Sequence, residues 1–321
     1  MLGMQELKET IEITETTVEC PVKGCGEKVQ RQREVFRREE KFKCPKHNIY
    51  ISPTTFEYQS EIDNILWKEK ADLDLFDRIK SAKRESRIAR DNSEDAVTWN
   101  VFRFLEKSEL LSEFLAKLRN SSATNPEIIY WSYSRSQQNV WNELKKARTE
   151  FGEIPQRSTE PDLIVKSDDA LFFIEAKLKA SSKVDFNKRH TAEEKKERIR
   201  RYGRGDRFLK RPVEDIIDAG YYQLMRLWVI GSSIAERVNL EFYLVNLVLS
   251  GKEEDIERDF KRYIKEDQSR KFLRITWEDI YQHISSSVLS GREEDMIMRY
   301  FKNKTVGYDG NGKLQRAFSI P

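Results

Sequence analysis

Apolar and polar residues follow two different periods along the second two-thirds of the chain. Short runs of alternating or wholly apolar residues predict β-strands at 127–134, 162–167, 170–178, 241–250, 272–277 and 313–320. Longer stretches with apolar residues three or four positions apart predict three helices. The first runs from Ser93 to about residue 105, the second follows the 127–134 strand and runs through Ala147, and the third covers 213–238. Because helices and strands are interspersed, the pattern predicts an α/β or α+β fold around one central sheet.

The N-terminal part of the chain has a different pattern. Residues 12–20 alternate and are β-branched, which predicts a strand that enters a turn at Pro21. Residues 61–90 are strongly charged, with apolar positions at helical spacing, and the segment 78–90 holds six basic residues and one acidic residue. These shifts predict three consecutive parts, which are a small module over 1–58, a charged helical linker over 59–90 and a main domain over 91–321.

The strands at 162–167 and 170–178 are separated by a short polar turn sequence. If the hairpin is centred between Asp168 and Asp169, Asp162 lies directly opposite Glu175. Lys177 is two residues beyond Glu175, so it points to the same face of the sheet. Two carboxylates held this close repel each other unless a cation lies between them, and oxygen ligands suit Mg²⁺ or Mn²⁺. A salt bridge on an edge hairpin is the alternative explanation of the same residues.

Pro161-Asp162, followed after twelve residues by Glu175-Ala176-Lys177, resembles the signature of the PD-(D/E)XK (restriction-endonuclease-like) nuclease superfamily. The resemblance covers about residues 90–250. It implies an α/β fold with a central mixed sheet flanked by helices, and a hydrolase that cleaves phosphodiesters with divalent metal. It implies that Asp162 and Glu175 bind Mg²⁺ (or Mn²⁺) and that Lys177 orients or deprotonates the attacking water.

The resemblance also implies residues on the flanking helices. A further carboxylate is expected from the helix before the hairpin, and Glu94 is the first choice for this metal ligand, with Asp95 second. Either residue could instead complement the helix dipole. In the helix after the lysine strand, Gln223 is expected in the active site and Arg226 at a phosphate, although either could be a helix-surface residue.

All three cysteines of the chain lie close to one of its three histidines. Cys20, Cys25, Cys44 and His47 have the spacing C-x4-C-x18-C-x2-H, with Pro and Gly beside the ligands. Two ligand-bearing turns of this kind are typical of a zinc ribbon, in which four tetrahedral ligands hold a structural Zn²⁺. Unrelated thiols are the alternative. His190 and His283 have no comparable neighbours in the sequence and are expected at the surface.

The segment between the lysine strand and the next helix is strongly basic. Residues 188–211 hold eleven Lys and Arg against four Asp and Glu. This composition favours contacts with a phosphate backbone, a role assigned to Arg200, Arg201, Arg204 and Arg207. A solvated helix with internal ion pairs is the alternative.

Composition narrows the function classes without choosing a substrate. Basic and acidic residues nearly balance, at 58 and 55, and no apolar run is long enough for a membrane span, which favours a cytoplasmic protein without a membrane partner. The resemblance to the nuclease superfamily implies a DNA endonuclease in defence, mobile elements or repair, with RNA the less favoured substrate. Concerted cleavage of two strands would require a homodimer. A non-catalytic DNA- or protein-binding module on the same fold is the alternative function.

Overall fold

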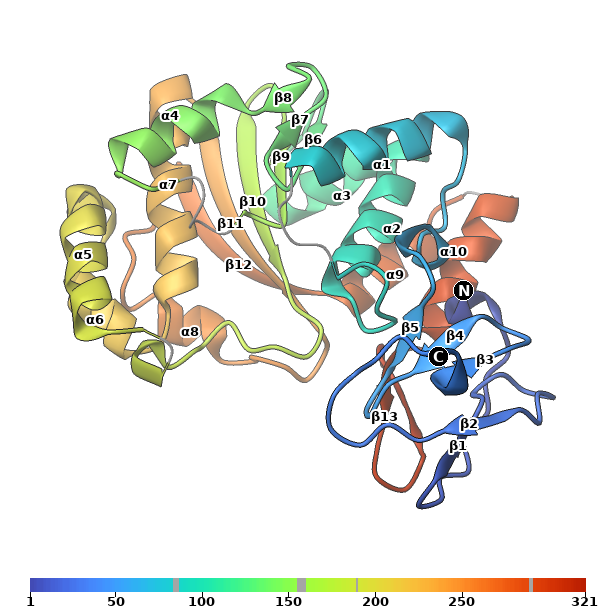
Figure 1. The fold of residues 1–321 in the computed structure, drawn as a ribbon. Coiled ribbons are helices and arrows are strands. Elements are labelled where there is room, and N and C mark those ends of the chain that lie inside the picture. Colours follow the sequence, from blue (N-terminus) through green and yellow to red (C-terminus); the bar gives the residue numbers. More distant parts are fainter. Residues whose placement is uncertain (83–86, 155–159, 189, 289–290) are drawn as a thin grey trace. The chain divides into compact units, whose positions relative to one another are not determined.

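The computed structural model describes residues 1–82, 87–154, 160–188, 190–288 and 291–321 (Figure 1). The chain divides into two compact units. Unit 1 comprises Met1–Leu75, Glu85–Glu109 and Trp277–Pro321, and unit 2 comprises Phe76–Arg84 and Leu110–Thr276. Each unit buries a hydrophobic core of its own residues.

Unit 2 is built on a seven-stranded mixed sheet with helices packed on it, so the structure is α/β. Its strands are β6 (Glu127–Tyr130), β7 (Tyr133–Ser134), β8 (Asn139–Val140), β9 (Leu163–Lys166), β10 (Ala170–Ala176), β11 (Glu241–Val248) and β12 (Arg270–Thr276). Their order is β12-β11-β10-β9-β6-β7-β8, with β10, β11 and β12 parallel and the other neighbours antiparallel. Every residue of β10 is buried, as expected for a central strand.

The β9–β10 hairpin has the predicted register. Leu163 pairs with Ile174 and Lys166 with Leu171, so the hairpin is centred between Asp168 and Asp169. The turn is closed by Ser167, whose backbone N–H donates to the carbonyl of Ala170 over 2.8 Å. The Ser167 hydroxyl also accepts from the Ala170 N–H, which explains why this sequence turns here.

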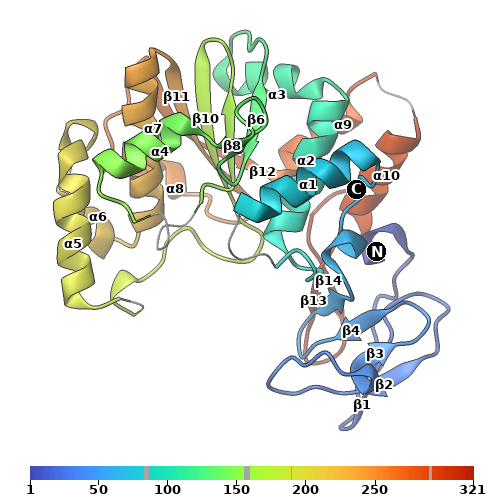
Figure 2. The ribbon, with the colours of Figure 1, turned by 45° about the horizontal axis from the view of Figure 1, so that its top comes forward.

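The helices of unit 2 are α3 (Leu110–Arg119), α4 (Asn142–Glu150), α5 (Ala192–Tyr202), α6 (Val213–Asp218), α7 (Tyr222–Val238) and α8 (Ile256–Phe260), with 3₁₀ turns at Phe186–Lys188 and Gly203–Phe208. Helix α7 packs on β10 and β11, and α4 and α6 contact α7 (Figure 2). No helix of the described residues is long and apolar enough to cross a bilayer.

Two predicted elements are interrupted. The helix predicted over 213–238 is divided into α6 and α7 by Gly220, which has φ +88° and whose carbonyl accepts from the N–H of Val184. A Cβ at this position would also crowd the Val184 backbone, so glycine is required. The strand predicted over 127–134 is broken at Trp131 and Ser132, which both have positive φ and form the turn between β6 and β7.

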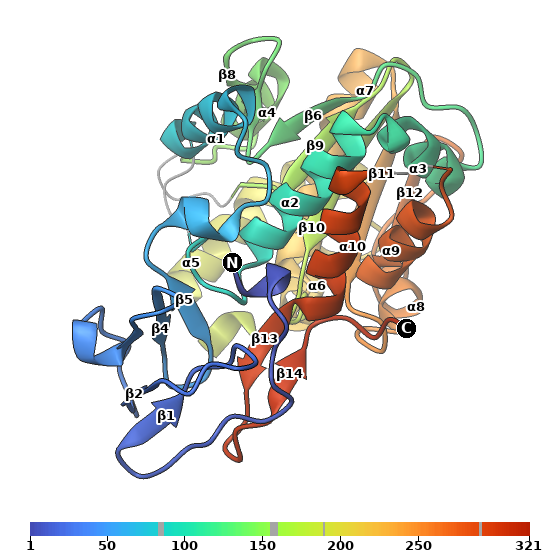
Figure 3. The ribbon, with the colours of Figure 1, turned by 90° about the vertical axis from the view of Figure 1, so that its right-hand side faces the viewer.

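Unit 1 combines three small sheets with helices from distant parts of the sequence (Figure 3). Its strands are β1 (Thr17–Glu19), β2 (Lys28–Gln30), β3 (Lys43–Cys44), β4 (Ile49–Ile51), β5 (Phe56–Tyr58), β13 (Thr305–Tyr308) and β14 (Leu314–Arg316). Its helices are α2 (Glu94–Lys107), α9 (Trp277–Ser285) and α10 (Arg292–Asn303), with 3₁₀ turns at Leu2–Met4, Glu40–Phe42 and Glu61–Asn64. Helix α1 (Lys70–Ala82) begins in unit 1 and ends in unit 2.

Helix α2 begins where the sequence predicts. The Ser93 side chain accepts from the Ala96 N–H, and Glu94 and Asp95 occupy the first turn. Helix α10 packs against α2, α9 and the N-terminal 3₁₀ turn.

The two units cut across the three predicted parts. Unit 1 holds the first 75 residues together with α2 and the C-terminal segment from Trp277. One reason is a buried carboxylate. Asp91 accepts from the hydroxyls of Tyr58 and Thr305 and lies 3.5 Å from the ammonium of Lys304, so residues far apart in sequence meet at one charge.

We predict that Gly231→Ala destabilises unit 2. Alanine in a helix is normally favoured over glycine by about 1 kcal/mol, but a Cβ at Gly231 of α7 would lie 2.2 Å from the ring of Phe242 on β11. Overpacking of this kind costs about 1–3 kcal/mol, measurable as a lower free energy of unfolding in urea. Ser233→Ala, at a half-buried position of the same helix, is the control and should change stability little. A stabilised Gly231→Ala protein would contradict the packing described here.

Candidate functional site

A cavity of about 480 Å³ opens in unit 2 at the end of the β9–β10 hairpin. Its walls come from the hairpin, the segment after β10, helix α5 and the start of α7. Asp162, Glu175, Lys177 and Gln223 all line it. The structure thus brings together the three residues predicted from the hairpin register and the one predicted from the following helix. Its full lining also includes Glu160, Ala180, Ser181, Ser182, Val184, Phe186, His190, Arg198, Arg201, Tyr202, Gly220, Tyr222 and Arg226.

Asp162 and Glu175 occupy the next paired position beyond the hydrogen-bonded ladder of the hairpin. Asp162 precedes β9, and its carboxylate accepts from the backbone N–H of Ala176 over 2.9 Å. Glu175 lies on β10 and its side chain is only 5% exposed. On the same face, Ile164 and Phe173 belong to the hydrophobic core, so the two carboxylates lie where the apolar face of the sheet ends.

The Glu175 carboxylate is only partly compensated. Its Oε1 lies 2.5 Å from the ammonium of Lys177. Its Oε2 is buried and has no hydrogen-bond partner among the described residues. A buried carboxylate oxygen without a partner is costly, and an oxygen-liganded cation shared with Asp162 would satisfy it. The residues present therefore fit a divalent metal. Among the described residues, however, no third carboxylate, cysteine or histidine lies close enough to this pair to form a three-ligand cluster.

The segment after β10 is held in place by one carboxylate. Glu253 accepts from the Ser182 N–H over 2.6 Å, from the Ser181 hydroxyl and from the Asn246 amide. Asn246 is the neighbour of Glu175 on β11, and its side-chain oxygen accepts from the Ser182 hydroxyl. Burial alone would raise the pKa of Glu253, but these hydrogen bonds hold it below its usual value. The serines that line the cavity are thereby tied to the central sheet.

A buried ion-pair chain lies behind the α7 side of the cavity. Arg226 donates to both oxygens of Glu153, over 2.7 and 2.8 Å, and the hydroxyl of Tyr202 donates to the same carboxylate. Arg148 lies 3.3 Å from Glu153 and 2.9 Å from Glu160. Burial would raise the pKa of Glu153, but the charge and hydrogen bonds of Arg226 outweigh it and lower the pKa to about 2. Arg226 lines the cavity, yet its charge is already paired.

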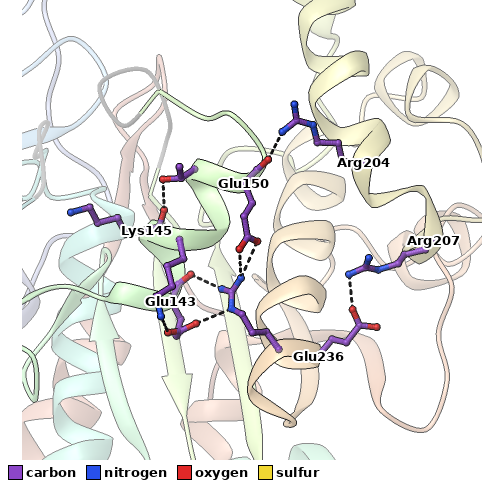
Figure 4. Close-up of polar contacts among 9 residues, drawn as sticks. Glu143, Lys145, Glu150, Arg204, Arg207 and Glu236 are labelled. Carbon is purple, nitrogen blue, oxygen red and sulfur yellow. Dashed lines mark hydrogen bonds and ion pairs between the residues drawn. The ribbon is translucent and has the colours of Figure 1, made fainter.

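The arginines predicted to bind nucleic acid are divided by the structure. Arg201 lines the cavity and pairs with Glu197 of the same helix. Arg204 donates to the carbonyl of Glu150, and Arg207 pairs with Glu236 (Figure 4). Neither of these two lines the cavity. Arg200 is exposed and does not line it either.

Sequence reasoning missed several cavity residues. Arg198, Phe186 and Glu160 line it, and so does His190, which was expected at the surface and instead packs on the Phe186 ring at 4.3 Å. His283 was also expected at the surface and is buried. For Arg198 a signal existed, because it lies three residues before Arg201 and therefore on the same face of α5.

The predicted helix carboxylates lie in the other unit. Glu94 and Asp95 form the first turn of α2 in unit 1, whereas the hairpin belongs to unit 2. Their membership of the metal site stays a prediction, and their dipole position at the start of α2 is what the structure describes.

The Cys/His motif forms a cluster in unit 1. The ligand atoms of Cys20, Cys25, Cys44 and His47 all lie within 4.8 Å of one another. His47 Nδ1 is 3.4 Å from the Cys20 sulfur and 3.6 Å from that of Cys44, and the sulfurs of Cys25 and Cys44 are 4.0 Å apart. Tetrahedral zinc bonds imply edges of roughly 3.6 Å for S–N and 3.8 Å for S–S. The cluster can therefore hold a metal ion such as zinc.

Two turns present these ligands. Cys20 and Cys25 lie in the connection of the β1–β2 hairpin, and Cys44 and His47 lie at the β3–β4 turn. The ammonium of Lys8 donates to the carbonyls of Cys20 and Cys25, which holds the first turn closed. Burial and the neighbouring thiols raise the pKa of the Cys20 thiol, so a bound cation is needed to favour its thiolate.

Comparison of the chain with protein-family models, curated proteins and solved structures gives no match.

We predict that the purified protein holds one zinc ion per chain in the Cys/His cluster. Cys44→Ser removes one of four ligands, so it should release the metal and lower the melting temperature. Lys46→Gln, an exposed position in the same turn, is the control and should keep the metal. Metal analysis by mass spectrometry after dialysis measures the outcome. Equal zinc contents in wild type and Cys44→Ser would rule out this cluster as the site.

We predict that Glu153→Gln lowers the free energy of unfolding by roughly 3 kcal/mol at neutral pH, because it leaves Arg226 and Arg148 buried without their shared carboxylate. The folded pKa of Glu153 lies below its ordinary value of 4.5, so its stabilising contribution is complete above that pH and is lost as pH falls towards about 2. The gap between wild type and variant should therefore narrow on acidification.

Urea unfolding followed by circular dichroism across this pH range measures the effect. Glu150→Gln is the matched control, because Glu150 is half-exposed and pairs with Arg237 at the surface. Equal destabilisation by the two variants at neutral pH would contradict the buried network.

Proposed function

We propose that this protein is a divalent-metal-dependent nuclease that hydrolyses phosphodiester bonds of DNA, with the cavity of unit 2 as its active site. The observation that supports this most is the buried Glu175 oxygen without a partner, beside Asp162 and bonded through its other oxygen to Lys177. Ordinary packing does not require two carboxylates and an ammonium to meet at the mouth of an apolar sheet face.

In this proposal Asp162 and Glu175 hold Mg²⁺ or Mn²⁺. When bound, the ion would lower the pKa of a water molecule and offset negative charge on the phosphate. Lys177 has the reach and charge to orient the attacking water and to donate to the phosphate as charge develops. Its hydrogen bond to Glu175 Oε1 keeps the ammonium beside the carboxylate whose other oxygen would bind the metal.

The other lining residues fit supporting roles. Gln223, at the start of α7, is a neutral hydrogen-bonding group at the cavity wall. Arg201 and Arg226 also line this wall, where each already pairs with a carboxylate, Glu197 and Glu153 respectively. Glu160 also lines the cavity, but it forms an ion pair with Arg148. In this proposal, therefore, only Asp162 and Glu175 are the carboxylates that face the metal.

The architecture is consistent with a restriction-endonuclease-like fold. A hairpin carries the motif in the middle of a mixed sheet, a helix follows the lysine strand, and the next strand, β11, is parallel to β10. We propose that the Cys/His cluster is a zinc ribbon that engages DNA or a partner protein.

We expect the purified protein to cleave plasmid DNA in Mg²⁺ or Mn²⁺. Asp162→Asn, Glu175→Gln and Lys177→Met should each lower the rate at least 100-fold, because each removes a group from the site of charge development. Cleavage is measured on supercoiled, linear and single-stranded DNA and on RNA. Asp168→Asn, in the turn at the other end of the same hairpin, is the control and should retain activity.

A metal titration makes the test independent of the correct DNA substrate. Mn²⁺ binding, measured by electron paramagnetic resonance, should weaken in Asp162→Asn and Glu175→Gln and persist in Asp168→Asn. Mn²⁺ bound equally by all four proteins would count against the site. DNA bound but never cleaved would favour a non-catalytic binding module.

A further inference from the structure

The cavity is divided into an acidic and a basic side. Asp162 and Glu175 lie at the hairpin, whereas α5 contributes Arg198 and Arg201. These arginines are three residues apart and so share a face of the helix. Helix α5 is anchored by a capping box in which Thr191 accepts from the Glu194 N–H and Glu194 accepts from the Thr191 N–H. The basic side therefore belongs to a well-formed helix rather than to a loose loop.

Arg198 is held against two aromatic rings. Its guanidinium carbon lies 5.3 Å from the centre of the Phe186 ring and 5.1 Å from that of Tyr222. The two rings pack edge to face at 5.2 Å. Such contacts stabilise a cation and restrict the orientation of the planar group, whose N–H bonds point outward from its edge. Packing thus orients Arg198 without using its hydrogen-bonding capacity.

Among the described residues, Arg198 forms no close ion pair. Its Nε is buried without a hydrogen-bond partner, and no described carboxylate oxygen lies within 4.0 Å of its nitrogens. Glu194 interacts with Arg198 only at longer range, and its carboxylate accepts from the Thr191 N–H and faces His190. By contrast, Lys177, His190, Arg201 and Arg226, the other basic residues of the cavity, each face a carboxylate.

We propose that Arg198 is the residue that binds a phosphate group of the nucleic-acid strand inside this cavity. A part-buried guanidinium with an unused donor gains most from an anion that accepts several hydrogen bonds, and phosphate matches its planar edge. The inference rests on the proposed function for the identity of the strand. The cavity, at about 480 Å³, has the volume of a small-molecule site, so it holds about one nucleotide of a strand.

Binding is measured in EDTA, where no cleavage occurs, with a short fluorescein-labelled oligothymidylate. Arg198→Met should weaken binding at least about tenfold and reduce the slope of log affinity against log salt by about 0.7, the value for one lost phosphate contact on a single strand. Arg198→Lys keeps the charge but loses the planar stacking, so its affinity should be intermediate. Thymidine 5′-monophosphate should compete with the probe and thymidine should not.

Lys196→Gln is the matched control, because it removes one positive charge from an exposed position of the same helix. Equal losses in Arg198→Met and Lys196→Gln would show that only general surface charge matters and would overturn the proposal. Thymidine competing as well as its monophosphate would also overturn it. Thermal unfolding of each variant establishes that α5 remains folded.

The outcome is separable from that of the proposed function. Cleavage that depends on Asp162 and Glu175, with oligonucleotide binding unchanged in Arg198→Met, would refute the Arg198 proposal alone. Phosphate-specific binding that depends on Arg198, without cleavage of any nucleic acid, would support the binding site and refute the nuclease.

Discussion

The burial of the Glu175 carboxylate is the constraint on which the candidate site depends. A central strand of a mixed sheet carries this charge where its apolar face ends, and the sheet can tolerate it only with compensation. Lys177 supplies part of that compensation, and the hairpin register places Asp162 beside it. The remaining buried oxygen is where the proposed cation would bind, so the feature that is unfavourable for folding is the one that the proposed chemistry would use.

The surroundings of the site separate charges that serve folding from charges that face the cavity. Glu153 lies between Arg226 and Arg148, joining α7, α4 and the segment after α4 through one buried carboxylate. Outside the cavity, Arg204 and Arg207 satisfy acceptors on neighbouring helices (Figure 4). The basic segment therefore does not act as one surface, since several of its side chains, such as Lys195, Arg201 and Arg207, pair with carboxylates nearby. Arg198 differs because aromatic rings, rather than carboxylates, hold it.

The small sheets of unit 1 are stabilised in a different way. Its N-terminal sheets have two or three short strands each, too little to form an extended core, and two of these sheets meet at the Cys/His cluster. Four ligands around one ion can supply the folding free energy that a small apolar core lacks. Elsewhere in this unit the buried pair of Asp91 and Lys304 links the N-terminal strands to the C-terminal segment, which ties the ends of the chain together.

The sequence by itself determined the features that rest on local geometry. The alternation of strand residues and the Ser167 turn specified the hairpin register, Ser93 specified the start of α2, and the cysteine spacing specified the Cys/His cluster that can hold a metal. Tertiary structure decided the rest, because burial and partners depend on residues far away in the chain. Arg198 lines the cavity because α5 packs it against Phe186 and Tyr222. Arg204 and Arg207 lie outside the cavity because they contact Glu150 of α4 and Glu236 of α7. Sequence spacing shows which side chains share a face, whereas the fold decides what that face meets.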